Sequence, residues 1–207
     1  ISVSTIGGYG DQAVAQHAIA LALAAIRQIA AMDRDIRSGI WLPRLGREFG
    51  EMTFGIMGMG GIGRATAELA LGLGFDVIGW NRSPLSSAPC RMVSFDKLLS
   101  DSDILSLHLA LTPDTTGLLD ARALSRMRKD AILVNTARAG LLDHAALVAA
   151  LDQDALAHAA LDVFEQEPLP LADPLLARSD VTLSAHAGFK TDAAMRRLLV
   201  AALKQME

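Results

Sequence analysis

From about residue 53 onward, short apolar runs alternate with longer stretches of mixed polarity. Apolar runs bounded by turn-forming residues are typical of strands buried on both faces of a sheet. We expect strands at residues 54–59, 76–80, 104–109, 131–135, 157–163 and 181–184. Helical spacing predicts helices at residues 62–73, 95–99, 121–127 and 144–151, and a final helix at 191–206. This alternation predicts an α/β fold, a doubly wound parallel sheet with helices on both faces.

The N-terminal part of the chain follows a different pattern. Residues 1–10 predict a short strand that runs into a glycine-rich turn at residues 7–10, and Asp11 is suited to cap the helix that follows. Alanine and leucine then dominate residues 12–37, which predicts one long helix that is apolar almost all the way round. Such a helix must be covered on all sides, either by its own domain or by another subunit.

Composition narrows the class of protein. The chain has 207 residues, 51% of them apolar, and a net charge of -4 with no basic run, which argues against nucleic acid as a partner. Cys90 is the single cysteine, and we interpret it as an incidental thiol that fits a reducing compartment. We expect a cytoplasmic protein without a metal site or a membrane partner, because no signal peptide and no uninterrupted apolar run of membrane-spanning length are visible. The chain begins with Ile1 rather than Met, which leaves a longer N-terminus open.

A glycine-rich loop joins a predicted strand to a predicted helix. Its sequence is Gly58-Met59-Gly60-Gly61-Ile62-Gly63. In this pattern the first glycine permits a tight turn, the second lets a pyrophosphate approach the backbone, and the third lets the helix pack on the strand. Free N–H groups at the helix N-terminus attract the phosphates. The motif in this context predicts a dinucleotide site, and the alternative is a glycine-rich turn without a ligand.

The end of the second predicted strand indicates which dinucleotide is bound. An acid that holds a ribose 2′-hydroxyl is expected there, but the position is occupied by Asn81, 18 residues after Gly63, and Arg82 and Ser83 follow it. Asn does not repel a 2′-phosphate, and an adjacent Arg can bind one. The pattern favours NADP over NAD. The alternative is that Arg82 is a solvated surface cation and Asn81 a turn former before Pro84.

Charged side chains follow three later predicted strands: Arg138, an acid cluster with Glu165 and Glu167, and His186. Carboxyl ends of parallel strands share one edge of a sheet, so we expect these residues to meet the glycine loop. An arginine suits carboxylate binding, and a histidine beside an acid suits proton transfer. The alternatives are a structural histidine and solvated loop acids. We interpret His108, which lies in a predicted strand, as structural.

Taken together, these motifs resemble those of the D-isomer-specific 2-hydroxyacid dehydrogenases. The similarity runs from about Val14-Ala15-Gln16-His17 to the final helix, and five motifs in order are more specific than any one of them. They are Gly58-Met59-Gly60-Gly61-Ile62-Gly63, Leu107-His108-Leu109-Ala110-Leu111-Thr112-Pro113, Asn135-Thr136-Ala137-Arg138, Asp162-Val163-Phe164-Glu165-Gln166-Glu167-Pro168 and His186-Ala187-Gly188.

The resemblance implies a domain organisation. Residues 11–190 would form the Rossmann-type NAD(P)-binding domain, and its helix at 12–37 would form a homodimer. Residues 1–10 would be a remnant of a flavodoxin-like substrate domain, and residues 191–207 a helix that returns toward it. In the family, a first domain of roughly 100 residues precedes this region and completes the substrate site, so we expect residues 1–207 alone to provide only part of that site.

The resemblance also implies roles for individual residues. Arg138 would bind the substrate carboxylate, and His186 would be the general acid in reduction and the base in oxidation. Glu167 would pair with His186, and we prefer it to Glu165 because the family's catalytic acid directly precedes the proline. The cofactor would be contacted by a further set: Asp162 at the nicotinamide carboxamide, Thr136, Ala137 and Gly188 at the nicotinamide end, and Leu109 through its backbone.

The implied function is NAD(P)-dependent interconversion of 2-oxoacids and D-2-hydroxyacids by hydride transfer, with glyoxylate or hydroxypyruvate as candidate substrates. Three departures from the family pattern stand out: Asn81-Arg82 replaces a common Asp, Ala139 replaces a Gly, and Gly61 stands where Arg is common. Rival interpretations are a dinucleotide-sensing corepressor, a phosphite-type dehydrogenase and a fragment whose glycine loop binds nothing. A formate enzyme would carry Gln at position 167.

Overall fold

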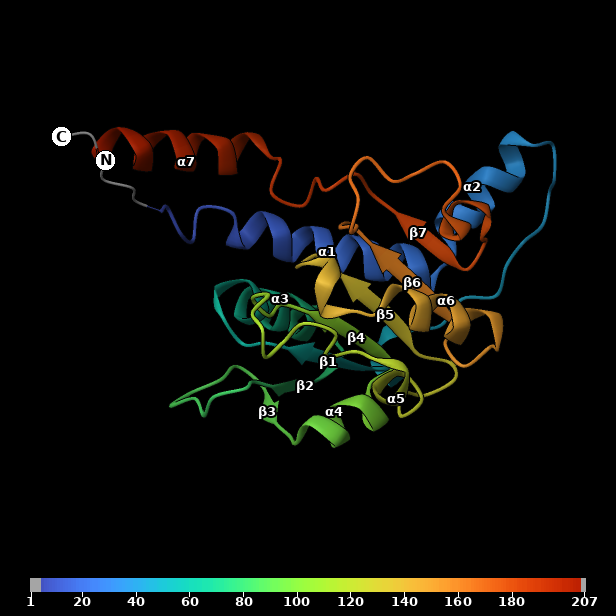
Figure 1. Ribbon diagram of the computed structural model, residues 1–207, viewed down its shortest axis with the longest axis horizontal. Coiled ribbons are helices and arrows are strands. Elements are labelled where there is room, and N and C mark those ends of the chain that lie inside the picture. Colours follow the sequence, from blue (N-terminus) through green and yellow to red (C-terminus); the bar gives the residue numbers. More distant parts are fainter. Residues whose placement is uncertain (1–4, 206–207) are drawn as a thin grey trace.

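The computed structural model describes residues 5–205, which form an α/β domain around a seven-stranded parallel sheet (Figure 1). The strands are β1 (Thr53–Met57), β2 (Asp76–Trp80), β3 (Arg91–Met92), β4 (Ile104–Leu107), β5 (Ile132–Asn135), β6 (His158–Leu161) and β7 (Val181–Leu183). Their order across the sheet is β3-β2-β1-β4-β5-β6-β7. The sheet therefore grows in opposite directions from the boundary of β1 and β4, and in such folds ligands bind at the carboxyl edge beside this boundary. The predicted fold class is confirmed.

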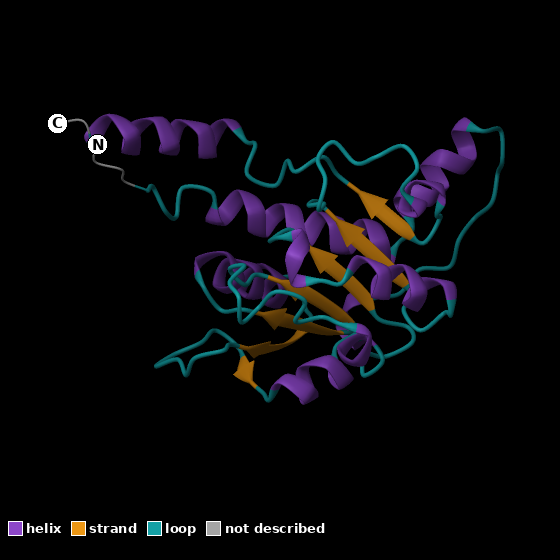
Figure 2. Ribbon diagram, viewed as in Figure 1, coloured by secondary structure: helices purple, strands orange, loops and turns teal. Residues whose placement is uncertain are grey.

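Helices cover both faces of the sheet, as Figure 2 shows. One apolar core packs α1 (Asp11–Ile26) and α3 (Gly61–Gly72) against it. The other core packs α4 (Phe95–Asp101), α5 (Ala121–Leu124) and α6 (His144–Asp152). Side chains of β1 alternate between the two cores because successive strand residues point to opposite faces: Phe54 and Ile56 join the first and Met57 the second.

Several strands end earlier than predicted, at the edge where the glycine loop lies. Residues 58–59, 108–109, 162–163 and 184 belong to loops rather than to β1, β4, β6 and β7. Gly58 leaves the sheet with a φ of +101°, which an L side chain rarely adopts. The edge strand β3 was not predicted, because its two residues are exposed and carry no apolar pattern.

The prediction of one long helix at residues 12–37 is wrong. The chain forms α1 and then α2 (Ile29–Arg37), which are bent by 63° relative to each other at Arg27 and Gln28. Gln28 has a φ of +52°, a left-handed conformation that interrupts a helix. The apolar surface of α1 is covered by its own domain, since it packs on α3, β5, β6 and β7. Asp11 lies in the first turn of α1, and the N-cap position is Gly10 rather than Asp11.

The predictions for the two ends of the domain can be compared with the structure only in part. Residues 5–7 form no strand and residues 8–10 form a turn, whereas Ile1 and Val3 of the expected strand lie outside the described residues. The last helix, α7 (Asp192–Lys204), begins after Thr191, whose hydroxyl accepts a hydrogen bond from the N–H of Ala194 at 3.2 Å. It extends away from the sheet in Figure 1.

Within residues 5–205, no single helix is long and apolar enough to cross a membrane. The bent pair formed by α1 and α2 reaches that length and apolar composition when both helices are counted together. Half of the residues of α1 are buried inside the domain.

Candidate functional site

A cleft of about 400 Å³ opens at the carboxyl edge of the sheet. It is bordered by the loops after β4, β5, β6 and β7 and by the first turn of α3. Eight residues of the predicted site line it: Ile62, Leu109, Thr136, Ala137, Arg138, Asp162, His186 and Gly188. The remaining predicted residues lie outside this lining, namely Gly58, Gly60, Gly61, Gly63, Asn81, Arg82, Ser83 and Glu167.

The glycine loop packs too tightly for side chains at two positions. A Cβ on Gly58 would lie 2.8 Å from the carbonyl of His108, and a Cβ on Gly63 would lie 1.9 Å from the carbonyl oxygen of Gly58. A Cβ on Gly60, in contrast, would meet no atom of the described chain within 4 Å. The N-terminus of α3 thus faces open space at Gly60, and this geometry fits a pyrophosphate.

The amide of Asn81 is engaged by the chain itself. Its Oδ1 accepts a hydrogen bond from the N–H of Met59 at 3.0 Å, and its Nδ2 donates to the carbonyl of Ser83 at 2.9 Å. Asn81 therefore ties the end of β2 to the glycine loop. The neighbouring Arg82 lies 3.1 Å from Asp114, a partner that the sequence pattern did not indicate.

Arg138 projects from a loop that is shaped by a buried asparagine. Asn135 Oδ1 accepts from the N–H of Ala137 at 3.0 Å, and its Nδ2 donates to the carbonyl of Arg138 at 3.0 Å. The Arg138 side chain is exposed at the cleft, and its guanidinium donates to the carbonyl of Ala137 at 2.6 Å. An exposed guanidinium at this place is available to an anion in the cleft.

Glu167 and His186 form a hydrogen-bonded pair. Glu167 Oε2 lies 2.8 Å from His186 Nδ1, and Glu167 Oε1 accepts from the N–H of Phe164 at 3.0 Å. The hydrogen bond from His186, and then that from Phe164, lower the pKa of Glu167. His186 has a left-handed backbone with a φ of +48°, a strained conformation of the kind often found in functional loops. The pair unites two residues that are 19 positions apart in sequence.

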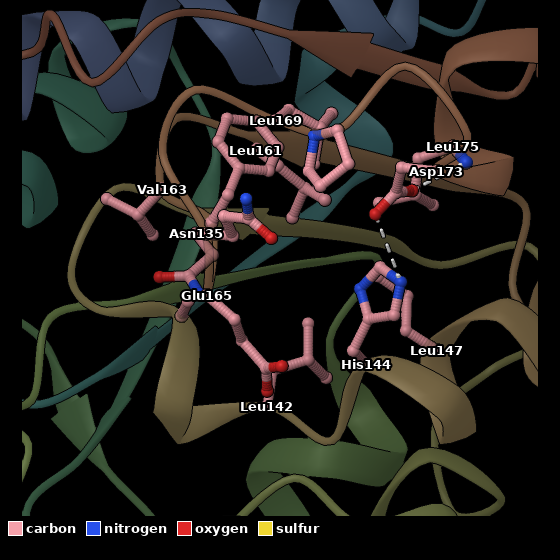
Figure 3. Close-up of a pocket in the computed structure, with 14 residues that line it drawn as sticks. Asn135, Leu142, His144, Leu147, Leu161, Val163, Glu165, Leu169, Asp173 and Leu175 are labelled. Carbon is pink, nitrogen blue, oxygen red and sulfur yellow. Dashed lines mark hydrogen bonds and ion pairs between the residues drawn. The ribbon is translucent and has the colours of Figure 1, made fainter.

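Glu165 lies apart from this pair. It borders a separate cavity of about 180 Å³ between α6 and the loop after β6. Figure 3 shows Glu165 on one side of that cavity and the ion pair of His144 and Asp173, 3.4 Å apart, on the other. The geometry favours Glu167 over Glu165 as the partner of His186.

Asp162 holds the loop that carries His186. Its buried carboxylate accepts hydrogen bonds from the hydroxyl of Ser184 at 2.5 Å, from His17 Nε2 at 3.2 Å, and from the N–H groups of Ala187 and Gly188 at 3.0 and 2.9 Å. Burial by itself raises the pKa of Asp162, but these four donors outweigh it and hold the pKa far below its usual range. A contact between Asp162 and a nicotinamide carboxamide stays a prediction.

Two buried side-chain polar atoms among the described residues lack a hydrogen-bond partner, His108 Nδ1 and Thr136 Oγ1. Both residues line the cleft, although the position of His108 in a predicted strand indicates a structural role. Burial lowers the pKa of His108 to about 3, so the imidazole is neutral at pH 7 and Nδ1 offers a hydrogen bond. Unpartnered polar atoms are costly unless a ligand or water satisfies them, so this lining fits a polar group such as a dinucleotide.

Sequence reasoning missed the N-terminal side of the cleft. Residues that line it there are Gly8, Tyr9, Gly10, Asp11 and Val14, and Phe189 borders it near His186. The glycine-rich turn at residues 7–10 was visible in the sequence, but its spacing pointed to no ligand. Within residues 5–205, no group of three or more His, Cys, Asp or Glu side chains is arranged to hold a metal ion.

The strand order and the glycine loop beside an open carboxyl edge define a dinucleotide-binding domain of the Rossmann type. Residues 19–188 match the family described as D-isomer specific 2-hydroxyacid dehydrogenase, NAD binding domain, and the chain belongs to that family.

The relatives compared with this chain are longer proteins. A glyoxylate reductase from Korarchaeum cryptofilum is 39% identical over 197 residues, 90% of this chain and 59% of that protein. The solved glyoxylate reductase from Paecilomyes thermophila has a TM-score of 0.91 and 36% identity over 100% of this chain and 64% of its own. A solved D-isomer specific 2-hydroxyacid dehydrogenase from Xanthobacter autotrophicus, in complex with NADPH and MES, has a TM-score of 0.82 and 33% identity. The match covers 93% of this chain and 62% of that protein. The chain thus spans about three fifths of the length of these relatives.

Proposed function

We propose that this chain is the cofactor-binding part of an enzyme that interconverts 2-oxoacids and D-2-hydroxyacids, with glyoxylate or hydroxypyruvate as candidate substrates. The observation that carries the proposal is the 2.8 Å hydrogen bond between Glu167 and His186, because His186 lines the same cleft as Arg138. Reduction of an anionic carbonyl compound needs a group that binds the carboxylate and a group that delivers a proton. The family and its glyoxylate reductase relatives support the same activity.

Each catalytic residue has a distinct task in this proposal. The Arg138 guanidinium binds the substrate carboxylate through paired hydrogen bonds and polarises the carbonyl. Glu167 engages Nδ1 of His186, which leaves Nε2 to donate a proton to the carbonyl oxygen in reduction and to accept it in oxidation. The bound nicotinamide cofactor supplies or accepts the hydride. Asp162 keeps the His186 loop in place through the N–H groups of Ala187 and Gly188.

For the cofactor we propose NADP in preference to NAD. Asn81 places no charge at the end of β2, and Arg82 next to it can bind a 2′-phosphate. The glycines of the loop (Gly58, Gly60, Gly61 and Gly63), with Ile62 and Ser83, would surround the phosphates and the adenosine ribose. The Xanthobacter autotrophicus relative, which binds NADPH, supports this preference.

The proposal extends to the assembly. We propose a homodimer in which α2 and the apolar loop after it meet a second copy. We also propose that α7, with Leu199, Val200 and Leu203 exposed, packs against a substrate domain of the longer protein. The single cysteine supports a reducing compartment such as the cytoplasm.

The test is His186→Ala in the full-length protein. We expect kcat for glyoxylate reduction to fall by about a thousandfold or more, because the proton donor is lost. The Kd for NADPH, measured by fluorescence, should change less than about twofold. His144→Ala is the matched control, since His144 pairs with Asp173 in the other cavity and its loss should leave kcat unchanged. Unchanged turnover in the His186 variant would refute the assignment, and tight NADPH binding by a wild-type protein that reduces no 2-oxoacid would favour a dinucleotide sensor.

A further inference from the structure

The carboxylate of Asp11 lies against Gly61 of the glycine loop. Asp11 is the first residue of α1, yet its Oδ2 lies 1.9 Å from the point that a Cβ on Gly61 would occupy, and its Cγ lies 2.8 Å from that point. Gly61 is the first residue of α3. Asp11, at the start of α1, therefore fills the space that a side chain at the start of α3 would occupy. A side chain at position 61 would displace the Asp11 carboxylate.

The N-terminus of α3, where the Asp11 carboxylate lies, is electrostatically favourable for an anion. The N-terminus of a helix carries a partial positive charge and N–H groups that attract anions. Within the described chain no side chain caps α3, and its first turn contains no acid of its own. Asp11 also lines the cleft together with Ile62, so its charge lies beside the proposed position of the pyrophosphate. The inference that follows rests on that proposed placement of the dinucleotide.

We propose that Asp11 limits the affinity of the site for its dinucleotide. Its carboxylate competes with the pyrophosphate for the N-terminus of α3, so the bound anion must displace the carboxylate or tolerate its charge. Gly61 is the second part of this arrangement, because only the absence of its side chain gives the carboxylate room. The repulsion acts on the pyrophosphate that NADPH and NADH share, so it lowers the affinity for both cofactors equally. A weaker complex also releases its oxidised or reduced cofactor faster.

The experiment compares Asp11→Asn and Asp11→Ala with the wild-type chain by fluorescence titration of NADPH and NADH. Asn has the shape of Asp without its charge, and Ala removes the possibility of a new hydrogen bond from Asn to the phosphates. We expect both variants to bind both cofactors about five- to tenfold more tightly, as expected for one unit charge a few ångström away. The gain should shrink as salt rises to about 0.5 M, since salt screens a repulsion between charges.

Asp76→Asn is the matched control, because Asp76 is an exposed acid at the start of β2, the opposite end of a strand from the cleft. It should leave both affinities unchanged, and thermal unfolding should verify that every variant folds. Unchanged or weaker binding in both Asp11 variants would overturn the inference, the latter by assigning Asp11 to cofactor binding. Tighter cofactor binding by Asp11→Asn but not by Asp11→Ala would also overturn it, because a new hydrogen bond from Asn would then explain the higher affinity. Absence of binding in every protein would overturn the proposed dinucleotide site itself, so the two failures are distinguishable.

Discussion

Arg82 has two candidate anionic partners at the end of β2. Its Nη1 lies 3.1 Å from Asp114 Oδ2, and the two side chains are 53% and 78% exposed. An exposed ion pair of this kind contributes at most about 1 kcal/mol. A phosphate group carries a charge of about -1.5 to -2 and three strong acceptor oxygens. A 2′-phosphate can therefore take the guanidinium from Asp114, and the proposed preference for NADP depends on this competition.

We predict that Arg82→Gln weakens NADPH binding by about tenfold and leaves NADH binding within about twofold, because it removes a charge-assisted hydrogen bond to the 2′-phosphate. Asp114→Asn is the opposing variant: it releases Arg82 and should tighten NADPH binding without affecting NADH. Side-by-side fluorescence titrations measure both. If Arg82→Gln lost affinity equally for the two cofactors, or if the wild-type chain bound NADH more tightly than NADPH, Arg82 would be only a surface cation.

At the scale of elements, β1 carries the glycine loop, and its position depends on close packing against the end of α4. An ideal Cβ on Gly55 would lie 2.0 Å from Ser102 Oγ and 2.9 Å from Ser102 Cβ. Ser102 is fully buried, and its hydroxyl donates to the carbonyl of Leu98 at 2.5 Å. Neither residue has room to move, because both lie where the sheet meets a helix in the apolar core.

We predict that Gly55→Ala lowers the free energy of unfolding by about 2–3 kcal/mol, the cost of overpacking a core. Gly72→Ala is the matched control at the last residue of α3, where a Cβ would meet no atom of the described chain within 4 Å. It should leave stability unchanged or raise it by up to about 1 kcal/mol, because Ala favours a helix over Gly. Urea unfolding followed by circular dichroism measures both. Equal stability of the two variants would mean that β1 and α4 leave room for a side chain at position 55.

Most helices and strands could be predicted because each has a periodic apolar pattern, but two features could not. The break between α1 and α2 depends on a left-handed Gln28, and nothing in the alanine-rich sequence signals that conformation. The strand β3 is held by backbone hydrogen bonds beside β2, such as that from the N–H of Val93 to the carbonyl of Gly79 at 2.8 Å. A strand of two exposed residues is too short to show the alternation of apolar and polar side chains that predicts a strand.

At the scale of the whole molecule, one exposed apolar segment lies after α1 rather than on it, where the sequence suggested an apolar surface. Trp41 and Leu45 are 83% and 92% exposed, and Ile36, Ile40 and Leu42 are exposed with them. This apolar segment, residues 36–45, runs from the end of α2 into the loop that arches beside it at the right of Figure 1. Several exposed large apolar side chains in one segment are typical of a protein–protein interface.

We predict that the chain sediments as a dimer at micromolar concentration and that Trp41→Glu with Leu45→Glu shifts it to a monomer, because each carboxylate would be buried without a partner. Leu171→Glu is the control, since Leu171 is 96% exposed and lies in the loop after β6, outside this segment. It should leave the dimer intact. Sedimentation velocity measures the oligomeric state, and a monomeric wild-type chain would contradict the proposed interface.

The sequence by itself determined the class of fold, the glycine loop and the identity of the charged residues at the strand ends. These features are local: each depends on apolar periodicity or on glycines at fixed spacing. It also placed Arg138, Glu167 and His186 at one edge, because parallel strands bring their carboxyl ends together.

Tertiary structure decided how those residues are used. It paired His186 with Glu167 rather than Glu165. It gave Asp162 four hydrogen-bond donors, two of them backbone N–H groups next to His186, and it brought Asp11 against Gly61. These contacts join residues up to 145 positions apart, as between His17 and Asp162. Such distances are set by how helices and loops pack over the sheet, and no local pattern of side chains encodes them.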